Sequence, residues 1–304
     1  MPELTSVKPG FAARLEGVDA AHATDTDVAA VRSALAEHGV LVLPGQTLSE
    51  EEQVAFASRF GPLDGYQYAS DDYNAGSRPD LLWVSNVDEA GQRLEVMDRR
   101  RMLDIGNKLW HSDSSFKTIP GHLSMLYGIK VASEGGETQF ADLRAGYDAL
   151  SADMKILVED LVAEHSILHA RSMMGFDDWN EEFRAKYGAW VAHRIVRRLP
   201  ETGRKTLYLS SHASHIVGLP IPIGRMLLHE LVDISTTPDK VYSHQWRQND
   251  LVIWDNRCTL HRVRRYRASA EARIMRRVTT QATDFPATDP ATVEVPDWIV
   301  EQAA

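Results

Sequence analysis

The chain has 304 residues, of which 43 are acidic and 33 basic, and its formal net charge is −10. This acidic balance argues against a general nucleic-acid binder and against attraction to an anionic membrane surface. Hydrophobic residues make up 43% and charged residues 25% of the chain, which excludes disordered and collagen-like proteins. No apolar run approaches the roughly 20 residues that a membrane span needs, and the first residues lack the pattern of a secretory signal. The single cysteine, Cys258, fits a small buried residue, and we expect a cytoplasmic protein.

Two capped helices are predicted near the start of the chain. After Asp25-Thr26-Asp27, apolar residues recur at helical spacing until Gly39, which indicates a capped amphipathic helix. Ser49 with Glu52 three residues later is the pattern of a capping box, and a second helix should follow it and end at Gly61-Pro62.

The remaining pattern is rich in short strands. In chain order we expect strands over 40–43, 81–87, 124–131 and 138–143, a helix over 144–164, a hairpin of 191–199 with 206–210, a helix over 223–234, and strands over 240–246, 251–254 and 273–280. Residues 172–190 are polar and aromatic without a clear period, so we expect an insertion or lid over about 165–190. Residues 285–304 read as a C-terminal tail. Many short strands with a few helices predict one domain, 1–304, built as a β-sandwich or open barrel with helices outside.

The segment Trp110-His111-Ser112-Asp113-Ser114-Ser115-Phe116 carries the clearest chemistry. Residues two apart on a strand point to the same face, so His111 and Asp113 could converge on one metal ion. Because His-x-Asp is common by chance, a polar strand end is the alternative. Dinucleotide-binding, phosphate-binding-loop, nucleophile-elbow and His-Glu-x-x-His patterns are absent from the sequence.

A third ligand could come from His261, which follows an apolar strand and a polar turn. Two histidines and one carboxylate make the facial triad of non-haem Fe(II) oxygenases. This triad leaves three coordination positions open for a substrate, a co-substrate and O₂.

An arginine-rich run, Arg273-Ile274-Met275-Arg276-Arg277, begins twelve residues after His261. On a strand, Arg273 and Arg277 share one face and Arg276 points the other way. Guanidinium groups aimed into a metal site fit ligands that carry carboxylates. Four residues along a strand span about 13 Å, so Arg273 and Arg277 should bind different carboxylates. A solvated basic edge strand is the alternative.

The chain resembles the taurine dioxygenase/chlorophenoxyacetate dioxygenase group of Fe(II)- and 2-oxoglutarate-dependent oxygenases. The resemblance runs from about Phe11 to Thr280. Within the group, the chain is most similar to the chlorophenoxyacetate-cleaving branch. The motifs that carry it are Leu43-Pro44-Gly45-Gln46, Phe60-Gly61-Pro62-Leu63, the segment 109–116, Gly135-Gly136-Glu137-Thr138, His212-Ala213-Ser214-His215, and Trp254-Asp255-Asn256-Arg257 with His261.

The resemblance implies a mainly β fold with flanking helices, the double-stranded β-helix or jelly roll of cupin-like proteins. It also implies a set of roles: His111, Asp113 and His261 would hold Fe(II), Thr138 and Arg273 would hold the distal carboxylate of 2-oxoglutarate, Arg277 would face the anionic end of the substrate, and His212 would line the substrate site. Related halogenases lack the carboxylate ligand, so Asp113 favours hydroxylation. One departure concerns substrate identity. That branch has a substrate-binding Lys beyond the Phe-Gly-Pro-Leu motif, where this chain reads Asp64-Gly65-Tyr66-Gln67-Tyr68-Ala69.

The activity implied by the resemblance is hydroxylation of a small anionic organic substrate, with 2-oxoglutarate converted to succinate and CO₂. An aryloxyalkanoate is favoured, hydroxylated between ether oxygen and carboxylate so that it collapses to a phenol and a 2-oxo acid, as in the breakdown of aromatic compounds. A taurine-like sulfonate or another small carboxylate is the alternative within the family. A non-catalytic metal-binding jelly roll and a zinc hydrolase are the alternatives from other classes. Neither nucleic acid nor a membrane is expected as a partner, and a homo-oligomer is left open.

Other histidines and aromatic residues have weaker interpretations. His212 and His215 could form a second metal pair, although the sequence shows no nearby carboxylate or Cys to complete it. The histidines expected to be structural or at the surface are His165, His169, His193 and His244. The aromatic residues that could line an apolar pocket, or pack in the core or lid, are Tyr66, Tyr68, Trp179 and Trp190.

Overall fold

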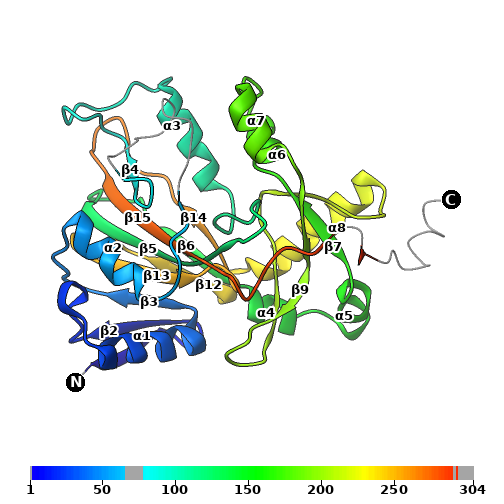
Figure 1. Cartoon of the computed structure of the whole chain (residues 1–304), viewed down its shortest axis with the longest axis horizontal. Coiled ribbons are helices and arrows are strands. Elements are labelled where there is room, and N and C mark those ends of the chain that lie inside the picture. Colours follow the sequence, from blue (N-terminus) through cyan, green and yellow to red (C-terminus); the bar gives the residue numbers. More distant parts are fainter. Residues whose placement is uncertain (1, 66–77, 290–291, 294–304) are drawn as a thin grey trace.

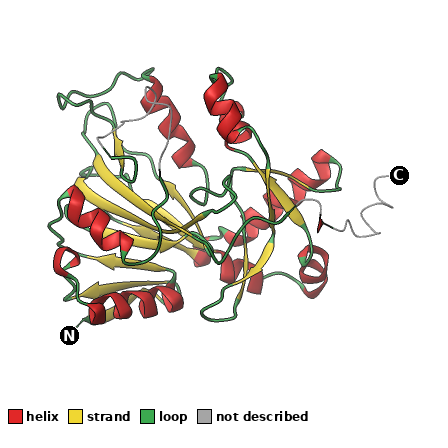
Figure 2. Ribbon diagram, in the orientation of Figure 1, coloured by secondary structure: helices red, strands yellow, loops and turns green. Residues whose placement is uncertain are grey.

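The computed structural model describes residues 2–65, 78–289 and 292–293. Two sheets form the centre of the molecule (Figures 1 and 2). The larger sheet has the order β1 (Glu3–Lys8), β2 (Ala12–Glu16), β3 (Val40–Leu43), β13 (Leu251–Asp255), β5 (Gly121–Lys130), β15 (Ile274–Gln281) and β4 (Leu82–Ser85). The smaller sheet has the order β12 (Val241–His244), β6 (Thr138–Asp142) and β14 (Thr259–Val263). Except for the parallel pair β2–β3, these neighbours run antiparallel. The expected jelly roll with flanking helices is confirmed.

Period-two alternation in the central strands builds a core on each face of the larger sheet. In β13, Leu251 and Ile253 pack with helices α1 (Asp25–His38) and α2 (Glu50–Ser58). Val252 and Trp254 point the other way, into the core between the two sheets. There Phe140 of β6 meets Trp254, with ring centroids 5.4 Å apart. Because both faces are buried, β13 reads as a continuous apolar run rather than an alternating one.

A second group of elements extends the fold beside the smaller sheet (Figure 1). It contains a three-stranded sheet, β11 (Ala213–Ile216), β7 (Val162–His165) and β8 (Val191–Arg194), and a hairpin, β9 (Val196–Arg198) with β10 (Lys205–Leu207). Its helices are α4 (Leu143–Asp148), α5 (Ala152–Val158), α6 (Ile167–Ser172), α7 (Glu181–Tyr187) and α8 (Ile221–Ser235). The remaining helical elements are α3 (Arg99–Leu103) and the 3₁₀ turns η1 (Ala20–His22), η2 (Asp104–Lys108) and η3 (Pro238–Lys240). No helix in the described ranges is long and apolar enough to cross a membrane.

The structure corrects three sequence-based expectations. The single helix expected over 144–164 is wrong, because α4 and α5 are separate short helices and β7 follows them. Ser151 begins α5 by accepting a hydrogen bond from the Met154 N–H, which starts a new helix rather than continuing the first. The cap of α1 is Thr24, not the Asp25-Thr26-Asp27 stretch. The hairpin expected from 191–199 and 206–210 is wrong in its first half, because β8 pairs with β7 and only β9 pairs with β10. Residues 165–190, expected to be an insertion or lid, contain α6 and α7.

The packing of Phe140 against Trp254 generates a stability prediction. Phe140→Ala should lower the free energy of unfolding by about 3–5 kcal/mol, because it removes a fully buried ring from between the two sheets. Denaturant titration monitored by circular dichroism measures this loss. Ile156→Ala, at a side chain 78% exposed, is the control and should change stability by less than about 0.5 kcal/mol. Equal effects of the two substitutions would contradict this account of the core.

Candidate active site

A short antiparallel bridge brings two histidines together. The His111 N–H donates to the His261 carbonyl over 3.0 Å, and the His261 N–H donates back to the His111 carbonyl over 2.9 Å. His261 belongs to β14, which pairs along its length with β6. The bridge therefore fixes His111, which lies outside the named strands, against an ordered sheet. Their ring centroids are 4.1 Å apart.

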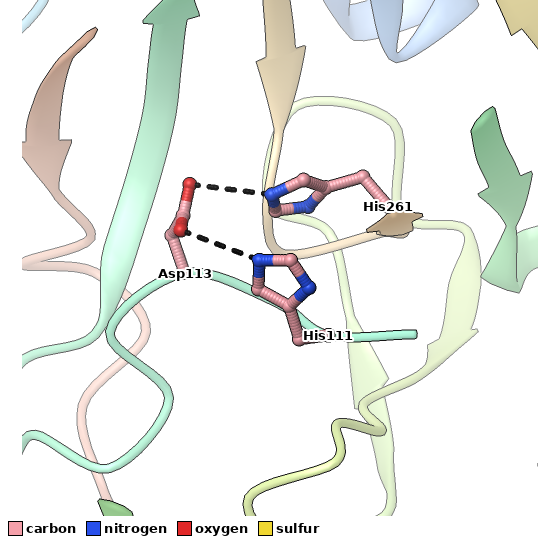
Figure 3. Close-up of side chains that lie close together, drawn as sticks. All are labelled: His111, Asp113 and His261. Atoms are coloured by element: carbon pink, nitrogen blue, oxygen red, sulfur yellow. Dashed lines mark ion pairs between the residues drawn. The ribbon is translucent and has the colours of Figure 1, made fainter. Parts of the chain in front are cut away.

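Asp113 completes the group, although not from a strand. The chain turns at Ser114, whose φ is 57°, so the expectation that His111 and Asp113 share one strand face is wrong in its geometry. The turn nevertheless brings the carboxylate to the imidazoles (Figure 3). His111 Nε2 lies 4.0 Å from Asp113 Oδ1, and His261 Nε2 lies 3.6 Å from Asp113 Oδ2. One ligand atom from each residue lies within 4.8 Å of the others.

Protonation prepares these three groups to bind a cation. Burial lowers the pKa of His111, and it lowers that of His261 well below its ordinary value, so both imidazoles are neutral at neutral pH. Burial alone would raise the pKa of Asp113, but the charge of Arg277 and the hydrogen bond from Ser124 lower it overall. Two neutral imidazoles and an ionised carboxylate are the donor set that a divalent transition metal requires.

Hydrogen bonds hold the candidate ligands in place. His111 Nδ1 lies 2.8 Å from the Leu109 carbonyl, which assigns its proton to Nδ1 and leaves the Nε2 lone pair toward Asp113. The Ser124 hydroxyl donates to Asp113 Oδ2 over 2.7 Å. Asn256 donates to Ser124 Oγ over 2.9 Å and accepts the Asp113 N–H over 3.0 Å. The sequence analysis named Asn256 only as part of a motif. Its role in holding Asp113 and Ser124 could not be predicted, because no residue pattern in the sequence indicates these contacts.

The turn after Asp113 is held by Asp64. The Ser114 hydroxyl donates to Asp64 Oδ2 over 2.5 Å, and Lys117 donates to Asp64 Oδ1 over 2.7 Å. Because Asp64 is buried, its carboxylate needs these two hydrogen-bond donors. Tyr66 and Tyr68, which follow it in the sequence, lie outside the described residues, and their prediction stays untested.

Arg277 contacts the candidate metal-binding group directly. Its Nη1 donates to Asp113 Oδ1 over 2.6 Å. Arg276 points to the opposite face of β15, where it donates to the Leu48 carbonyl over 2.6 Å. The expected division of the arginines between two strand faces is therefore present in the structure, and the alternative of a solvated basic edge strand is wrong because both side chains are largely buried.

A small cavity of about 50 Å³ joins the histidines to Thr138 and Arg273. The Trp246 indole N–H donates to Thr138 Oγ1 over 2.9 Å, so the Thr138 hydroxyl retains its own proton to donate to an anion. The Arg273 guanidinium has no hydrogen bond or ion pair among the described residues. Its Cζ lies over the Tyr266 ring, 5.9 Å from the ring centroid. Thr138 and Arg273 thus present donors to one end of the cavity.

Asn86, which the sequence analysis did not single out, and Gly135, named there only within a motif, shape the loops around Arg273. Asn86 Oδ1 accepts the Arg273 N–H over 2.7 Å, and the Asn86 amide donates to the Ala268 and Glu271 carbonyls over 2.8 Å each. Gly135 bridges Tyr266 with φ 74°, and a Cβ there would lie 2.3 Å from the Arg265 carbonyl oxygen. A glycine is therefore required where the loop before Arg273 meets the loop before Thr138.

His212 lies on the other side of the histidine pair. Its ring centroid is 6.4 Å from that of His111 and 4.9 Å from that of Phe116. Phe116 belongs to an apolar cluster with residues of α6 and α7. The cluster consists of Phe116, Ile167, Phe183 and Tyr187, with Leu168 and Trp179 packed against it. Trp179 therefore has the packing role expected for it, whereas Trp190 is 44% exposed.

The other histidines divide as follows. His215 Nε2 lies 3.3 Å from Glu164 Oε2, so a carboxylate does stand near it, but the metal-type cluster found among the described residues comprises His111, Asp113 and His261. His165, His193 and His244 are buried. His169 packs near Trp190, with ring centroids 6.0 Å apart. The lone Cys258 is buried, as expected, and burial raises its pKa.

A jelly roll on which two imidazoles and one carboxylate converge has the donor set of the non-haem iron oxygenases. Comparison with known proteins agrees. The solved structure reported as the crystal structure of AAD-2 in complex with Mn(II) and N-oxalylglycine aligns with a TM-score of 0.86 and 39% identity, covering 95% of this chain and 99% of that one.

Curated relatives are similar over most of their length. The alpha-ketoglutarate-dependent 2,4-dichlorophenoxyacetate dioxygenase of Cupriavidus pinatubonensis (strain JMP 134 / LMG 1197) is 42% identical over 274 residues, which cover 90% of this chain and 95% of that protein. The (S)-phenoxypropionate/alpha-ketoglutarate-dioxygenase of Sphingobium herbicidovorans is 36% identical and covers 83% of this chain and 85% of that protein.

The family model described as "Taurine catabolism dioxygenase TauD, TfdA family" matches residues 3–279. The chain belongs to this family, which confirms the resemblance seen in its motifs. It is a non-haem dioxygenase that uses Fe(II), 2-oxoglutarate and O₂.

The Asn256 contacts generate a prediction for metal affinity. Asn256→Leu should weaken Mn(II) or Fe(II) binding by about 10- to 100-fold, because it removes the acceptor that holds the Asp113 backbone and the donor that holds Ser124. Anaerobic calorimetric titration of the apoprotein measures the dissociation constant. Asn180→Leu is the matched control, since Asn180 caps α7 and does not contact the group. Unchanged affinity in Asn256→Leu would remove Asn256 from the support of the site.

Proposed function

We propose that the chain hydroxylates an aryloxyalkanoate at the carbon between its ether oxygen and its carboxylate. The product collapses to a phenol and a 2-oxo acid, while 2-oxoglutarate becomes succinate and CO₂. The observation that carries this proposal is the contact between Arg277 and Asp113, 2.6 Å long, which supports an anion-binding guanidinium beside the metal ligands. A guanidinium has five donors and can serve Asp113 and a substrate oxygen together. The substrate classes named for the relatives support the aryloxyalkanoate within the wider class of organic anions.

The metal site is proposed at His111, Asp113 and His261. The fit rests on three buried donors in their metal-binding protonation states and on the His111 Nδ1 contact, which leaves Nε2 for the metal. When bound, Fe(II) with 2-oxoglutarate supplies the activation of O₂, from which one oxygen atom enters succinate and the other the substrate C–H bond. The protein orients the reacting carbon and excludes competing reactions.

The co-substrate site is proposed at Thr138 and Arg273. Thr138 has a hydroxyl proton to donate, and Arg273 offers a buried guanidinium that binds a carboxylate bidentately. Both line the same cavity as His111 and His261, so a 2-oxo acid held at its far end can direct its other end to the metal site. Arg277 and His212 are left for the primary substrate. A cytoplasmic location is proposed with this, supported by the single, buried Cys258, which cannot form an internal disulfide.

The reaction is tested by anaerobic reconstitution with Fe(II) followed by exposure to O₂. Succinate is measured over a panel of aryloxyacetates, aryloxypropionates, sulfonates and amino-acid-like acids. We expect succinate and phenol in equal amounts from an aryloxyalkanoate, and little coupled turnover of its ester or amide. His261→Ala should lose Fe(II) binding and turnover because one of three ligands is removed, whereas His215→Ala should keep both. Coupled turnover of a sulfonate with none of any aryloxyalkanoate would overturn the substrate assignment.

If Arg273 and Arg277 bind separate anions, substituting each one should raise the KM of a different compound. Arg273→Ala should raise the apparent KM for 2-oxoglutarate by about 30-fold or more, because losing a charge-assisted partner of a buried charge costs about 2–5 kcal/mol. Arg277→Leu should instead raise the KM for the primary substrate and increase succinate formation without phenol. Arg276→Lys, on the other face of β15, is the control for both. If Arg273→Ala and Arg277→Leu changed the same KM, the two arginines would bind one anion, and the assignment of separate sites would be wrong.

A further inference from the structure

The hydroxyl of Ser210 has its lone pairs occupied by backbone donors. Ser210 Oγ accepts the Ser112 N–H over 3.2 Å and the His212 N–H over 3.3 Å. Backbone amides can only donate, and a serine hydroxyl has two lone pairs and one proton. The proton of Ser210 must therefore be donated, and the partner that the structure provides is His212 Nδ1, 3.0 Å away. His212 Nδ1 is thus an acceptor and carries no proton.

A second hydroxyl, that of Ser115, reaches the same nitrogen from a buried relay. Ser115 Oγ lies 2.9 Å from His212 Nδ1 and 3.1 Å from His165 Nδ1. His165 Nε2 is buried and has no hydrogen-bond partner among the described residues, so its proton is better placed on Nδ1, where it can be donated. His165 then donates to Ser115, and Ser115 donates on to His212. The Ser115 carbonyl is itself held by His193 Nε2 over 2.9 Å.

We propose that Ser210 and Ser115 fix His212 as the neutral tautomer protonated at Nε2, so that His212 recognises an oxygen of the substrate as a hydrogen-bond donor and not as a cation. Two hydroxyl donors at Nδ1 exclude a proton there, which leaves the single ring proton on Nε2. Among the described residues, Nε2 has no hydrogen-bond partner. The edge-to-face contact with Phe116, at 80°, holds the plane of the ring. Ser210 and Ser115 are positioning residues that act through His212.

The identity of the recognised oxygen rests on the proposed function. An aryloxyalkanoate offers a carboxylate oxygen and an ether oxygen, and both are acceptors. His212 lies beside His111, so an oxygen close to the metal site is within the region that it borders. A neutral donor there orients the substrate without adding a second positive charge beside Arg277. His212 therefore selects an acceptor atom, while Arg277 selects the negative charge.

The tautomer is tested without turnover. The full chain, labelled with ¹⁵N-histidine and loaded with diamagnetic Zn(II), is examined by long-range ¹H–¹⁵N correlation at neutral pH, with His212→Asn used for assignment. We expect a bare Nδ1 and a protonated Nε2 for His212. In Ser115→Ala and Ser210→Ala the Nδ1 signal should shift toward a mixed tautomer. A proton on Nδ1 in the unmodified chain overturns the proposal, and it does so whether or not any aryloxyalkanoate is turned over.

Kinetics test the donor role. Gln at position 212 can place an N–H near the Nε2 position, whereas Asn places it nearer Nδ1. His212→Gln should keep the KM for the aryloxy acid within about threefold, and His212→Asn should raise it about tenfold, the scale of one net hydrogen bond. Neither should change the KM for 2-oxoglutarate. Equal losses in the Gln, Asn and Ala variants overturn the proposal.

The serine variants separate positioning from simple structural damage. Ser210→Ala should raise the KM for the aryloxy acid about tenfold with kcat nearly kept, and Ser210→Thr should restore it. Because Ser210 also supports two backbone amides, Ser115→Ala is the second variant, and its hydroxyl contacts only the two histidine rings among its recorded partners. Ser214→Ala is the matched control, since that buried hydroxyl bonds His215 and not His212. A 3-arylpropionate, which lacks the ether oxygen, tells the two acceptors apart. The His212→Asn effect persists with it if the carboxylate is the acceptor and vanishes if the ether oxygen is. A tenfold effect of Ser214→Ala overturns the assignment to His212.

Discussion

The site depends on one pair of backbone hydrogen bonds, those that join His111 to His261. His261 is held by β14 and its pairing with β6, but His111 comes from a stretch outside the named strands. The bridge transfers the order of the smaller sheet to that stretch. The residues that directly follow His111 are then held in place, including the turn that positions Asp113. The convergence of His111, Asp113 and His261 therefore depends on sheet register, because a slip of one residue in β14 would turn His261 to the other face.

Buried charge explains why this site suits anionic ligands. Arg273 and Arg277 are both largely buried, and Arg277 is paired with Asp113, so the described lining of the cavity carries two guanidinium groups and no carboxylate. Burial lowers the pKa of Arg273, more than the Tyr266 and Asp104 side chains raise it, and its guanidinium has no ion pair among the described residues. Burial in turn raises the pKa of Asp104 to about 6. A ligand carboxylate supplies the missing negative charge. Because folding has already desolvated the guanidinium, the ion pair forms without paying that cost again, and this favours binding of the ligand.

The sequence was informative where residue type and spacing are sufficient. The strand over 40–43 and the Ser49 capping box appear as expected, because apolar runs and cap patterns are local signals. The three metal-site residues are brought together, but the strand geometry assumed for His111 and Asp113 was wrong, since a left-handed Ser114 cannot be read from a serine. Asn86 and Asn256 were missed as supports because their partners lie more than 100 residues away along the chain. The two helices within 165–190 were missed because their packing, and not their periodicity, defines them.

The two flanks of the site come from different parts of the architecture. Thr138 begins β6 and Arg273 immediately precedes β15, so the proposed co-substrate flank is built on the two central sheets. His212 immediately precedes β11, and its neighbour Phe116 packs against α6 and α7. The proposed substrate flank is therefore built on the elements beside the smaller sheet. Strands paired on both sides tolerate little change, whereas short helices packed on one cluster can be exchanged at lower cost in stability. This separation allows the apolar wall to vary with the substrate while the proposed metal and 2-oxo acid contacts stay fixed. Ser115 joins the two parts, because it is two residues from Asp113 and hydrogen-bonds His212, so the orientation of the His212 ring is tied to the same turn that places the Asp113 carboxylate.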